Sequence, residues 1–318
     1  MRTAHPSSFT AFSSPTRRRA ATRTRASTST DALDRWLERE LGARVVERAS
    51  AGGSQWARAL TRELENGARV FVKTSERGAE MFVGEAAGLR ALGATGAFVV
   101  PRVYGAGAMP EGAGGSFIAM ERVTLGARGA QDALGDALAR MHLAEPSHEE
   151  ARRGMFGFEV NNTIGETRQP NEWMDDWVEF WRDKRLMHMI ALARDAKLRE
   201  LAEKVVDKRL SDMFSSCGEI KPSLLHGDLW SGNIGTVGGK PSVFDPAVYY
   251  GHHEAEFGMS WCAGFSPAFW EAYHARIPKA PGFEERAKMY RLYHYLNHYV
   301  MFGGGYYHEC VSILKELA

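Results

Sequence analysis

The chain has 318 residues, of which 44% are hydrophobic and 25% are charged, and its 40 Lys and Arg nearly balance its 39 Asp and Glu. These values are typical of a globular protein with a buried core, and they exclude a coiled coil, a disordered chain and a disulfide scaffold. No apolar run reaches the roughly 18 residues that a membrane span needs. The near-zero net charge argues against a nucleic-acid partner, because no basic excess is available to neutralise phosphates.

Residues 1–30 differ in composition from the rest of the chain. They contain six Arg, six Ser and seven Thr but no Asp or Glu, and the first acidic residue is Asp31. An Arg-rich, hydroxyl-rich segment without acids is typical of an organelle transit peptide, whereas a secretory signal would need an apolar stretch. We therefore predict a disordered transit peptide over residues 1–30, for the chloroplast first and the mitochondrion as the alternative. A plain disordered basic tail is the competing interpretation.

Residues 31–122 are predicted to form a small lobe of mixed α and β structure. The expected elements are helices at 31–41 and 80–92, and strands at 58–64, 70–72, 99–104 and 117–120. The dipeptide Asn66-Gly67 between two of these strands is a strong hairpin signal. Before the hairpin, Ser50-Ala-Gly-Gly-Ser54 forms a short glycine loop, and its glycines would allow the backbone to approach a phosphate closely.

Residues 123–318 are predicted to form a larger, mainly helical lobe. Helical periodicity is found at 131–143, 173–194, 198–214 and from 254 onward, and short β-like segments only at 223–226, 233–236 and 242–245. The expected fold class is therefore α+β with two lobes, joined by a connector near residues 121–130. A cleft between two such lobes is a natural ligand site. The three cysteines are scattered and form no C-x-x-C pair, so we expect them to be reduced.

The strongest chemical signal is Leu224-Leu-His-Gly-Asp-Leu-Trp-Ser-Gly-Asn-Ile234, followed by Val243-Phe-Asp-Pro246. Asp228 lies in a loop after a short apolar strand, where its carboxylate can meet an incoming hydroxyl group. Asn233 and Asp245 each adjoin a predicted strand and offer the hard oxygen ligands that Mg²⁺ prefers. This arrangement is typical of kinase-type phosphoryl transfer. The alternative, that all three residues only cap turns, does not explain their common placement beside apolar strands.

The small lobe offers the partners that phosphoryl transfer requires. Lys73 ends the apolar strand Phe71-Val-Lys73, and Glu85 lies on the next predicted helix. Such a Lys can pair with the Glu and hold α- and β-phosphate oxygens, with Gly52, Gly53 and Ser54 close by. A solvated surface pair is the competing interpretation. The segment Met120-Glu121-Arg122 begins the connector, where backbone groups would bind an adenine edge.

Together these residues resemble the fructosamine-3-kinase, or ketosamine-3-kinase, family over residues 33–317. Besides the Asp228 loop, the matching segments are Gly84-Glu-Ala-Ala-Gly-Leu89, Asn162-Thr-Ile-Gly165, Gln169-Pro-Asn171, Trp173-x-x-Asp-Trp-Val-Glu-Phe180, Phe244-Asp-Pro-Ala247, Tyr249-Tyr-Gly251, Glu254-Ala-Glu256 and Phe302-Gly-Gly-Gly-Tyr306. The His-Gly-Asp-x4-Asn core alone is shared with aminoglycoside phosphotransferases and choline kinases. The longer segments are more specific.

The resemblance implies a protein-kinase-like fold and ATP-dependent phosphorylation of ketosamines at the third sugar carbon, which leads to deglycation of proteins or small amines. It also implies site roles, namely catalysis by Asp228, nucleotide binding by Gly52, Gly53, Ser54, Lys73, Glu85, Met120, Glu121 and Arg122, Mg binding by Asn233 and Asp245, and substrate contact by Trp230. His298 is expected to line the substrate cleft, although its i, i+4 spacing from His294 also fits a packed aromatic helix.

Four positions depart from related patterns. Gly227 replaces the Arg of protein kinases, and Pro246-Ala247 replaces their Phe-Gly, so control by activation-loop phosphorylation is not expected. Ser54 stands where many relatives carry a Cys, so we expect a monomer or a non-covalent homodimer. Two other functions stay open at this point. One is phosphorylation of another small molecule, such as an aminoglycoside or an amino alcohol, and the other is a catalytically dead nucleotide-binding scaffold.

Overall fold

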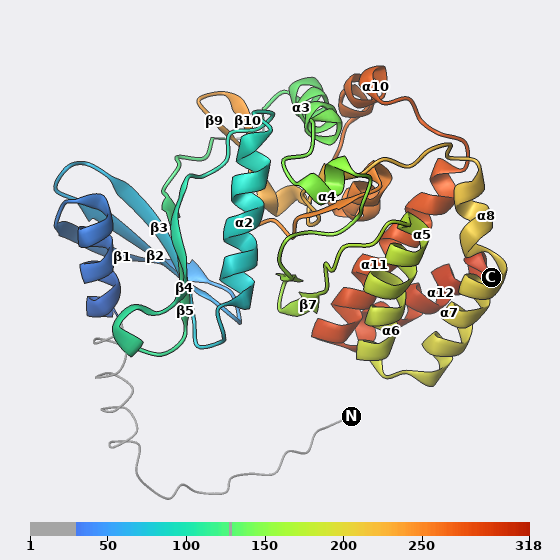
Figure 1. Cartoon of the computed structure of the whole chain (residues 1–318), viewed down its shortest axis with the longest axis horizontal. Coiled ribbons are helices and arrows are strands. Elements are labelled where there is room, and N and C mark those ends of the chain that lie inside the picture. Colours follow the sequence, from blue (N-terminus) through green and yellow to red (C-terminus); the bar gives the residue numbers. More distant parts are fainter. Residues whose placement is uncertain (1–29, 127–128) are drawn as a thin grey trace, which may run out of the picture.

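The computed structural model describes residues 30–126 and 129–318, so the predicted transit peptide lies outside the described residues, except for Thr30, which begins a helix. Figure 1 shows two lobes, a smaller one built on a sheet (blue to green) and a larger one made mostly of helices (green to red). The predicted α+β, two-lobed fold class is confirmed.

The small lobe is built on one five-stranded antiparallel sheet in the order β1-β2-β3-β5-β4. Its strands are β1 (Val45–Gly53), β2 (Arg58–Leu64), β3 (Arg69–Ser75), β4 (Val103–Ala108) and β5 (Ser116–Glu121). A helix at residues 30–41, helix α2 (Glu80–Ala94) and the 3₁₀ turn η1 (Pro110–Gly112) complete the lobe. Both predicted helices and the predicted hairpin at Asn66-Gly67 are confirmed.

The two faces of this sheet bury different sets of apolar side chains, as the two-residue period of a strand requires. Phe117 and Ala119 of β5 pack with Val70 and Val72 of β3 under the helix at residues 30–41. Ile118 and Met120, which alternate with these residues in β5, pack against α2 on the opposite face. Helix α2 is therefore sandwiched between the sheet and the large lobe (Figure 1).

The large lobe is helical with three two-stranded ladders, β6–β7, β8–β11 and β9–β10. Its helices are α3 (Gln131–Leu143), α4 (Glu149–Arg152), α5 (Trp177–Phe180), the π-helical η2 (Trp181–Leu186), α6 (Met187–Ala193), α7 (Ala196–Lys208), α8 (Leu210–Ser215), the 3₁₀ segments η3 (Ser231–Asn233) and η4 (His253–Met259), α9 (Ser260–Ala263), α10 (Pro267–Arg276), α11 (Phe283–Phe302), the 3₁₀ turn η5 (Gly304–Tyr306) and α12 (Tyr307–Leu317). Its strands are β6 (Asn162–Ile164), β7 (Thr167–Gln169), β8 (Ser223–Leu225), β9 (Ile234–Val237), β10 (Lys240–Val243) and β11 (Tyr249–Gly251).

Several predicted elements need correction. Strand β1 was not predicted, because it lies at the sheet edge and buries only Val45, so its sequence lacks alternation. The helix expected from residue 173 begins at Trp177, because the Asp176 carboxylate caps it by accepting a hydrogen bond from the Glu179 N–H. The helix expected at 198–214 is divided between α7 and α8. Three strands of three residues each, β6, β7 and β11, were missed because such short segments show no period.

The three cysteines, Cys217, Cys262 and Cys310, are free, as predicted. Within the described ranges, no helix combines the length and apolarity needed to cross a membrane.

Candidate active site

A cavity of about 570 Å³ opens where residues of the two lobes meet. Its volume lies in the range of small-molecule sites. Residues predicted from the sequence line much of it, namely Gly53, Ser54, Lys73, Glu85, Asp228, Trp230, Asn233, Asp245 and His298. The structure therefore brings together polar side chains that lie far apart in the sequence.

Lys73 lies at the centre of the charged part of this cavity. Its ammonium group donates to Glu85 Oε1 at 2.8 Å and to Asp245 Oδ1 at 2.6 Å. Lys73 is on β3, Glu85 is on α2, and Asp245 follows β10, so the three residues link the sheet of the small lobe to the large lobe. The alternative of a solvated surface pair is wrong, because the side chains of Lys73 and Glu85 are only 16% and 7% exposed.

Lys73 and the two carboxylates shift one another's pKa values. Burial disfavours the Lys73 ammonium, but the carboxylates of Glu85 and Asp245 outweigh this effect and raise the pKa of Lys73 above its ordinary value. Partial removal from water would raise the pKa of Asp245, yet the Lys73 charge outweighs it and the net pKa lies below its usual range. Lys73 is therefore a fixed positive charge, suited to contact phosphate oxygens.

Asp228 occupies a loop held in place by hydrogen bonds. His226 Nδ1 accepts the Asp228 N–H at 3.3 Å, and His226 Nε2 lies 3.1 Å from the Phe244 carbonyl. Burial raises the pKa of Asp228 to about 7, and the negative charge of Asp245 adds to this effect, while the hydrogen bond from Asn233 opposes it. A carboxylate with a pKa raised to about 7 is suited to accept a proton from a substrate hydroxyl.

Asn233 joins Asp228 to the Asp245 segment. Its amide Nδ2 donates to the Asp228 carbonyl at 2.9 Å, to Asp228 Oδ2 at 3.3 Å and to the Asp245 carbonyl at 3.3 Å. Because the amide nitrogen makes these contacts, the amide oxygen is the atom that remains to meet a metal ion. Asp245 adopts a left-handed backbone conformation with φ of 60°, which Asp tolerates better than most residues.

The glycine loop forms the tip of the β1–β2 hairpin. Position 53 requires glycine, because a Cβ atom there would lie 2.4 Å from the Ala57 carbonyl oxygen. The Ser54 hydroxyl accepts the Ala57 N–H at 3.2 Å and closes the turn. Gly53 and Ser54 line the cavity with Trp56, whereas Gly52 pairs with Ala59 in the ladder and is not part of the lining.

The connector residues lie at the end of β5, away from the cavity lining described above. Met120 is buried against α2, the Glu121 N–H donates to the Arg102 carbonyl at 2.7 Å, and the Arg122 N–H donates to the Arg69 carbonyl at 2.9 Å. Both of these N–H groups are therefore occupied. Adenine binding at the connector stays a prediction, and it would need other backbone groups.

Aromatic side chains form the outer rim of the cavity. Trp230, Trp261 and Phe302 are 40%, 43% and 51% exposed, which is unusual for such large apolar groups. The His298 ring lies 6.2 Å from Trp261 and 5.8 Å from Phe302, and its Nδ1 atom is buried without a hydrogen-bond partner. This rim presents apolar ring faces to an incoming molecule.

The sequence did not predict the role of Glu256, which holds the backbone of the catalytic loop. Glu256 is buried and accepts the N–H groups of His226 at 2.7 Å and Gly227 at 3.0 Å, and His142 Nε2 lies 3.3 Å from its carboxylate. Burial would raise the pKa of Glu256, but these hydrogen bonds, with His142 the largest, hold it below its ordinary value. The available signal was the segment Glu254-Ala-Glu256, which belongs to the motifs shared with the family.

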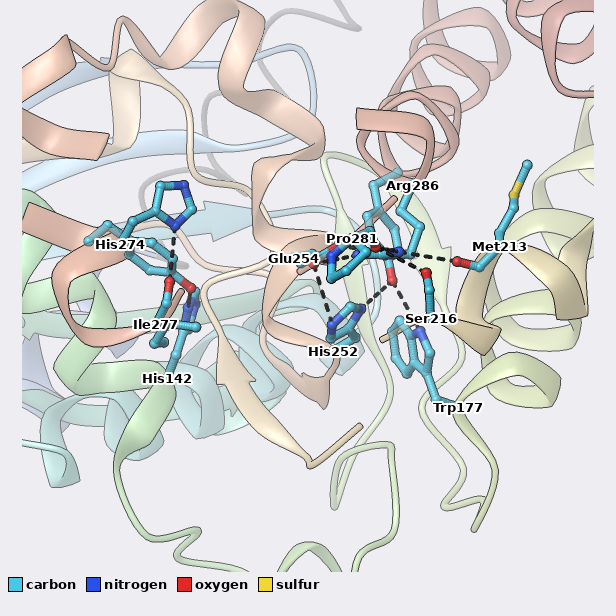
Figure 2. Close-up of polar contacts among 12 residues, drawn as sticks. His142, Trp177, Met213, Ser216, His252, Glu254, His274, Ile277, Pro281 and Arg286 are labelled. Atoms are coloured by element: carbon cyan, nitrogen blue, oxygen red, sulfur yellow. Dashed lines mark hydrogen bonds and ion pairs between the residues drawn. The ribbon is translucent and has the colours of Figure 1, made fainter. Parts of the chain in front are cut away.

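The neighbouring Glu254 anchors the same segment to the helical core, as Figure 2 shows. Its two carboxylate oxygens accept hydrogen bonds from Arg286 at 2.7 and 2.8 Å, and both side chains are buried. His252, beside Glu254 in the figure, contacts the Tyr290 hydroxyl at 2.8 Å. His252, His253 and Glu254 are near enough to suggest a metal site. Because Arg286 already occupies both oxygens of Glu254, this group is better suited to holding the fold.

Comparison with known proteins matches the chain to one family along almost its whole described length. The family model for fructosamine kinase matches residues 29–318. A chloroplastic protein-ribulosamine 3-kinase of Oryza sativa subsp. japonica is 41% identical over 316 residues, covering 95% of this chain and 90% of the relative. A ketosamine-3-kinase of Mus musculus is 35% identical over 312 residues, covering 90% of this chain and the whole relative.

Solved structures agree with this result. A provisionally assigned fructosamine-3-kinase of Thermobifida fusca superposes with a TM-score of 0.77 at 27% identity, covering 90% of this chain and 98% of the other. An aminoglycoside phosphotransferase solved with ADP and hygromycin B reaches a TM-score of 0.55 at 15% identity over 90% and 96% of the two chains, which shows a shared protein-kinase-like fold. On these matches and on the site geometry, the chain belongs to the fructosamine kinase family.

Proposed function

We propose that this chain transfers the γ-phosphoryl group of ATP to the third-carbon hydroxyl of a ketosamine sugar, which leads to deglycation of the amine. The observation that carries the proposal is the convergence of Lys73, Asp228, Asn233 and Asp245 on one cavity that also has an aromatic rim. The family supports the acceptor class, because relatives named for ribulosamine and ketosamine phosphorylation are 41% and 35% identical to this chain.

In the proposed reaction, the substrate hydroxyl oxygen forms a bond to the γ-phosphorus as the bond to ADP breaks. The hydroxyl proton passes to the Asp228 carboxylate, whose pKa of about 7 suits it to accept a proton near neutral pH. Lys73 balances the negative charge of the phosphates. Such transfer depends mainly on alignment and charge neutralisation, and alignment alone can contribute roughly 7–11 kcal/mol.

We also propose that Asn233 and Asp245 hold a magnesium ion. The orientation of the Asn233 amide fits this role, since its nitrogen is bound to Asp228 and to the Asp245 carbonyl and only its oxygen remains. Asp245 supplies a charged oxygen, and its side chain is 56% exposed, so an ion can reach it. A bound ion would neutralise phosphate charge during the transfer.

The acceptor is proposed to bind at the aromatic rim. Trp230 lies two residues after Asp228, and its indole lies over Gly232, where a Cβ atom would come within 2.3 Å of the ring. The apolar face of a sugar can pack on this indole. His298 is proposed to contact the acceptor at the same rim, where its ring lies beside those of Trp261 and Phe302.

Residues 1–30 are proposed to direct the chain to the chloroplast. Their composition supports this assignment, as do relatives from Oryza sativa and Arabidopsis thaliana that are named as chloroplastic. A fluorescent protein fused to residues 1–30 should accumulate in isolated chloroplasts. Retention outside chloroplasts, or uptake by mitochondria, would contradict the proposal.

The activity is tested by measuring ATP consumption with three acceptors side by side: a ribulosamine, a fructosamine and kanamycin. We expect turnover with at least one ketosamine and none with kanamycin. Turnover with kanamycin alone would move the chain to the aminoglycoside phosphotransferases. No turnover with any acceptor, despite ATP binding, would support a nucleotide-binding scaffold.

A further inference from the structure

Helix α2, which carries Glu85, contacts the large lobe directly through its glycines. A Cβ atom at Gly84 would lie 2.5 Å from Asn162 Cβ and 2.9 Å from Asn162 Cα, on strand β6. A Cβ atom at Gly88, one turn later, would lie 2.9 Å from a methyl group of Val248. Only glycine fits at such distances, so the backbone of α2 rests against the large lobe without intervening side chains.

The partner of Gly84 belongs to a buried and fully connected set of hydrogen bonds. Asn162 Nδ2 donates to the Val248 carbonyl at 2.7 Å, and Asn162 Oδ1 accepts from Gln169 Nε2 at 2.8 Å. Gln169 Nε2 also donates to the Ala247 carbonyl at 3.1 Å, and the Tyr293 hydroxyl donates to Gln169 Oε1 at 2.6 Å. Asn162 and Gln169 are at most 1% exposed. Satisfied buried networks of this kind fix one local arrangement.

This network lies beside both partners of Lys73, namely Glu85 and Asp245. Glu85 directly follows Gly84 on α2, and Ala247 and Val248 follow Asp245 by two and three residues. Tyr293 lies on α11, and the residue after it, His294, lines the cavity. In kinases, the Lys–Glu pair forms only when its helix is correctly placed. Here the hairpin formed by β6 and β7 ties that helix to the segment that bears Asp245.

We propose that the β6–β7 hairpin, residues 162–169, is an interlobe clasp, and that Asn162 and Gln169 are positioning residues that keep Glu85 and Asp245 on opposite sides of Lys73. The tests that measure kcat rest on the proposed function, whereas the contacts that form the clasp do not depend on it. It gives a role to Gly84, Asn162 and Gln169, to which the catalytic chemistry assigns none.

The first test compares two glycine substitutions on the same helix. Gly84→Ala places a methyl group against Asn162, whereas Gly93→Ala meets nothing within 4 Å. We expect Gly84→Ala to lower kcat by about 100-fold, the size of effect that follows from misplacing reacting groups by about 1 Å. Gly93→Ala should change kcat by less than about twofold, since alanine is tolerated in an open helix position. Equal activity of the two variants would overturn the proposal.

The second test separates positioning from general stability. Gln169→Leu removes the hydrogen bonds to Asn162 and Ala247, and Glu85→Gln removes the charge that the clasp places. If Gln169 acts through Glu85, then adding Gln169→Leu to Glu85→Gln should lower kcat by less than about threefold, although Gln169→Leu alone lowers it by about 100-fold. Each variant is measured where urea titration shows it fully folded. Effects that multiply would overturn the positioning role.

A third measurement does not depend on catalysis. Hydrogen exchange of the α2 amides, residues 80–94, should accelerate about tenfold or more in Gln169→Leu, while exchange in the helix at residues 30–41 should not change. Unchanged exchange in α2 would overturn the clasp. If wild-type protein and Gly93→Ala both fail to phosphorylate any ketosamine, the proposed function fails, and the exchange result still decides on the clasp.

Discussion

Replacing Asp228 with Asn should lower turnover strongly and at the same time stabilise the fold. The folded protein holds the pKa of Asp228 at about 7, chiefly through burial, whereas an unfolded Asp titrates near 3.9. Between these two values the folded state binds a proton that the unfolded state does not bind. Stability therefore falls as the pH rises through this window, and the loss is complete above pH 7.

The magnitude follows from the size of the pKa difference. A rise of about three units corresponds to roughly 4 kcal/mol as an upper bound, at about 1.4 kcal/mol per unit. Asn has the same shape and no charge, so Asp228→Asn should raise the free energy of unfolding by about 2–4 kcal/mol at pH 8. The gain should shrink to less than half of that at pH 5, where the wild-type carboxyl is still protonated in the folded state.

The assay is urea denaturation of wild type and variant at pH 5 and pH 8, without nucleotide and with a chelator present. In parallel, kcat should fall by roughly 100- to 10,000-fold, the contribution expected of a general base, with ATP affinity nearly unchanged. A variant that is less stable than wild type at pH 8, or equally stabilised at both pH values, would refute the assignment of Asp228 as a half-buried proton acceptor.

Three further predictions follow from the same geometry. Lys73→Met should lower kcat/KM for ATP by about 100-fold or more, because one preorganised charge is lost; a loss below about tenfold in initial-rate assays would contradict its role. Trp230→Ala should raise KM for a ketosamine roughly tenfold with KM for ATP unchanged, since about 1.4 kcal/mol of apolar contact is lost; steady-state kinetics with both substrates check this. Arg286→Met should lower the free energy of unfolding by about 3–5 kcal/mol, because it leaves Glu254 buried and unpaired. The exposed Lys288 on the same helix is the control, and its replacement by Met should cost less than about 1 kcal/mol in the same urea titration.

Two pairs within the charged part of the site could be predicted because local sequence determines each of them. Asp228 and Asn233 lie on one short loop between strands, so their spacing alone brings them together. Lys73 and Glu85 are related by a strand and the helix that follows it, and both elements have clear periodic patterns. In both pairs the residues lie close together in the sequence, so a local pattern is enough to predict that they meet.

The supporting residues could not be predicted in the same way. Glu256 reaches the His226 and Gly227 amides from a 3₁₀ segment, and Asn162 reaches the Val248 carbonyl from a strand of three residues. Each contact depends on tertiary packing between segments whose own sequences show no period. A buried polar side chain reveals its partner only when the chain is folded, which also explains why Gly84 gave no structural signal until Asn162 was seen against it.

The clearest test of the account is phosphorus NMR of a reaction containing the chain, Mg·ATP and a peptide with one ribulosylated lysine. We predict a new phosphate monoester signal on the sugar that grows in step with ADP, and we predict that both form at least about 100-fold more slowly with Asp228→Asn. Release of ADP with inorganic phosphate alone, or a phosphorylated sugar that forms equally well with Asp228→Asn, would contradict it.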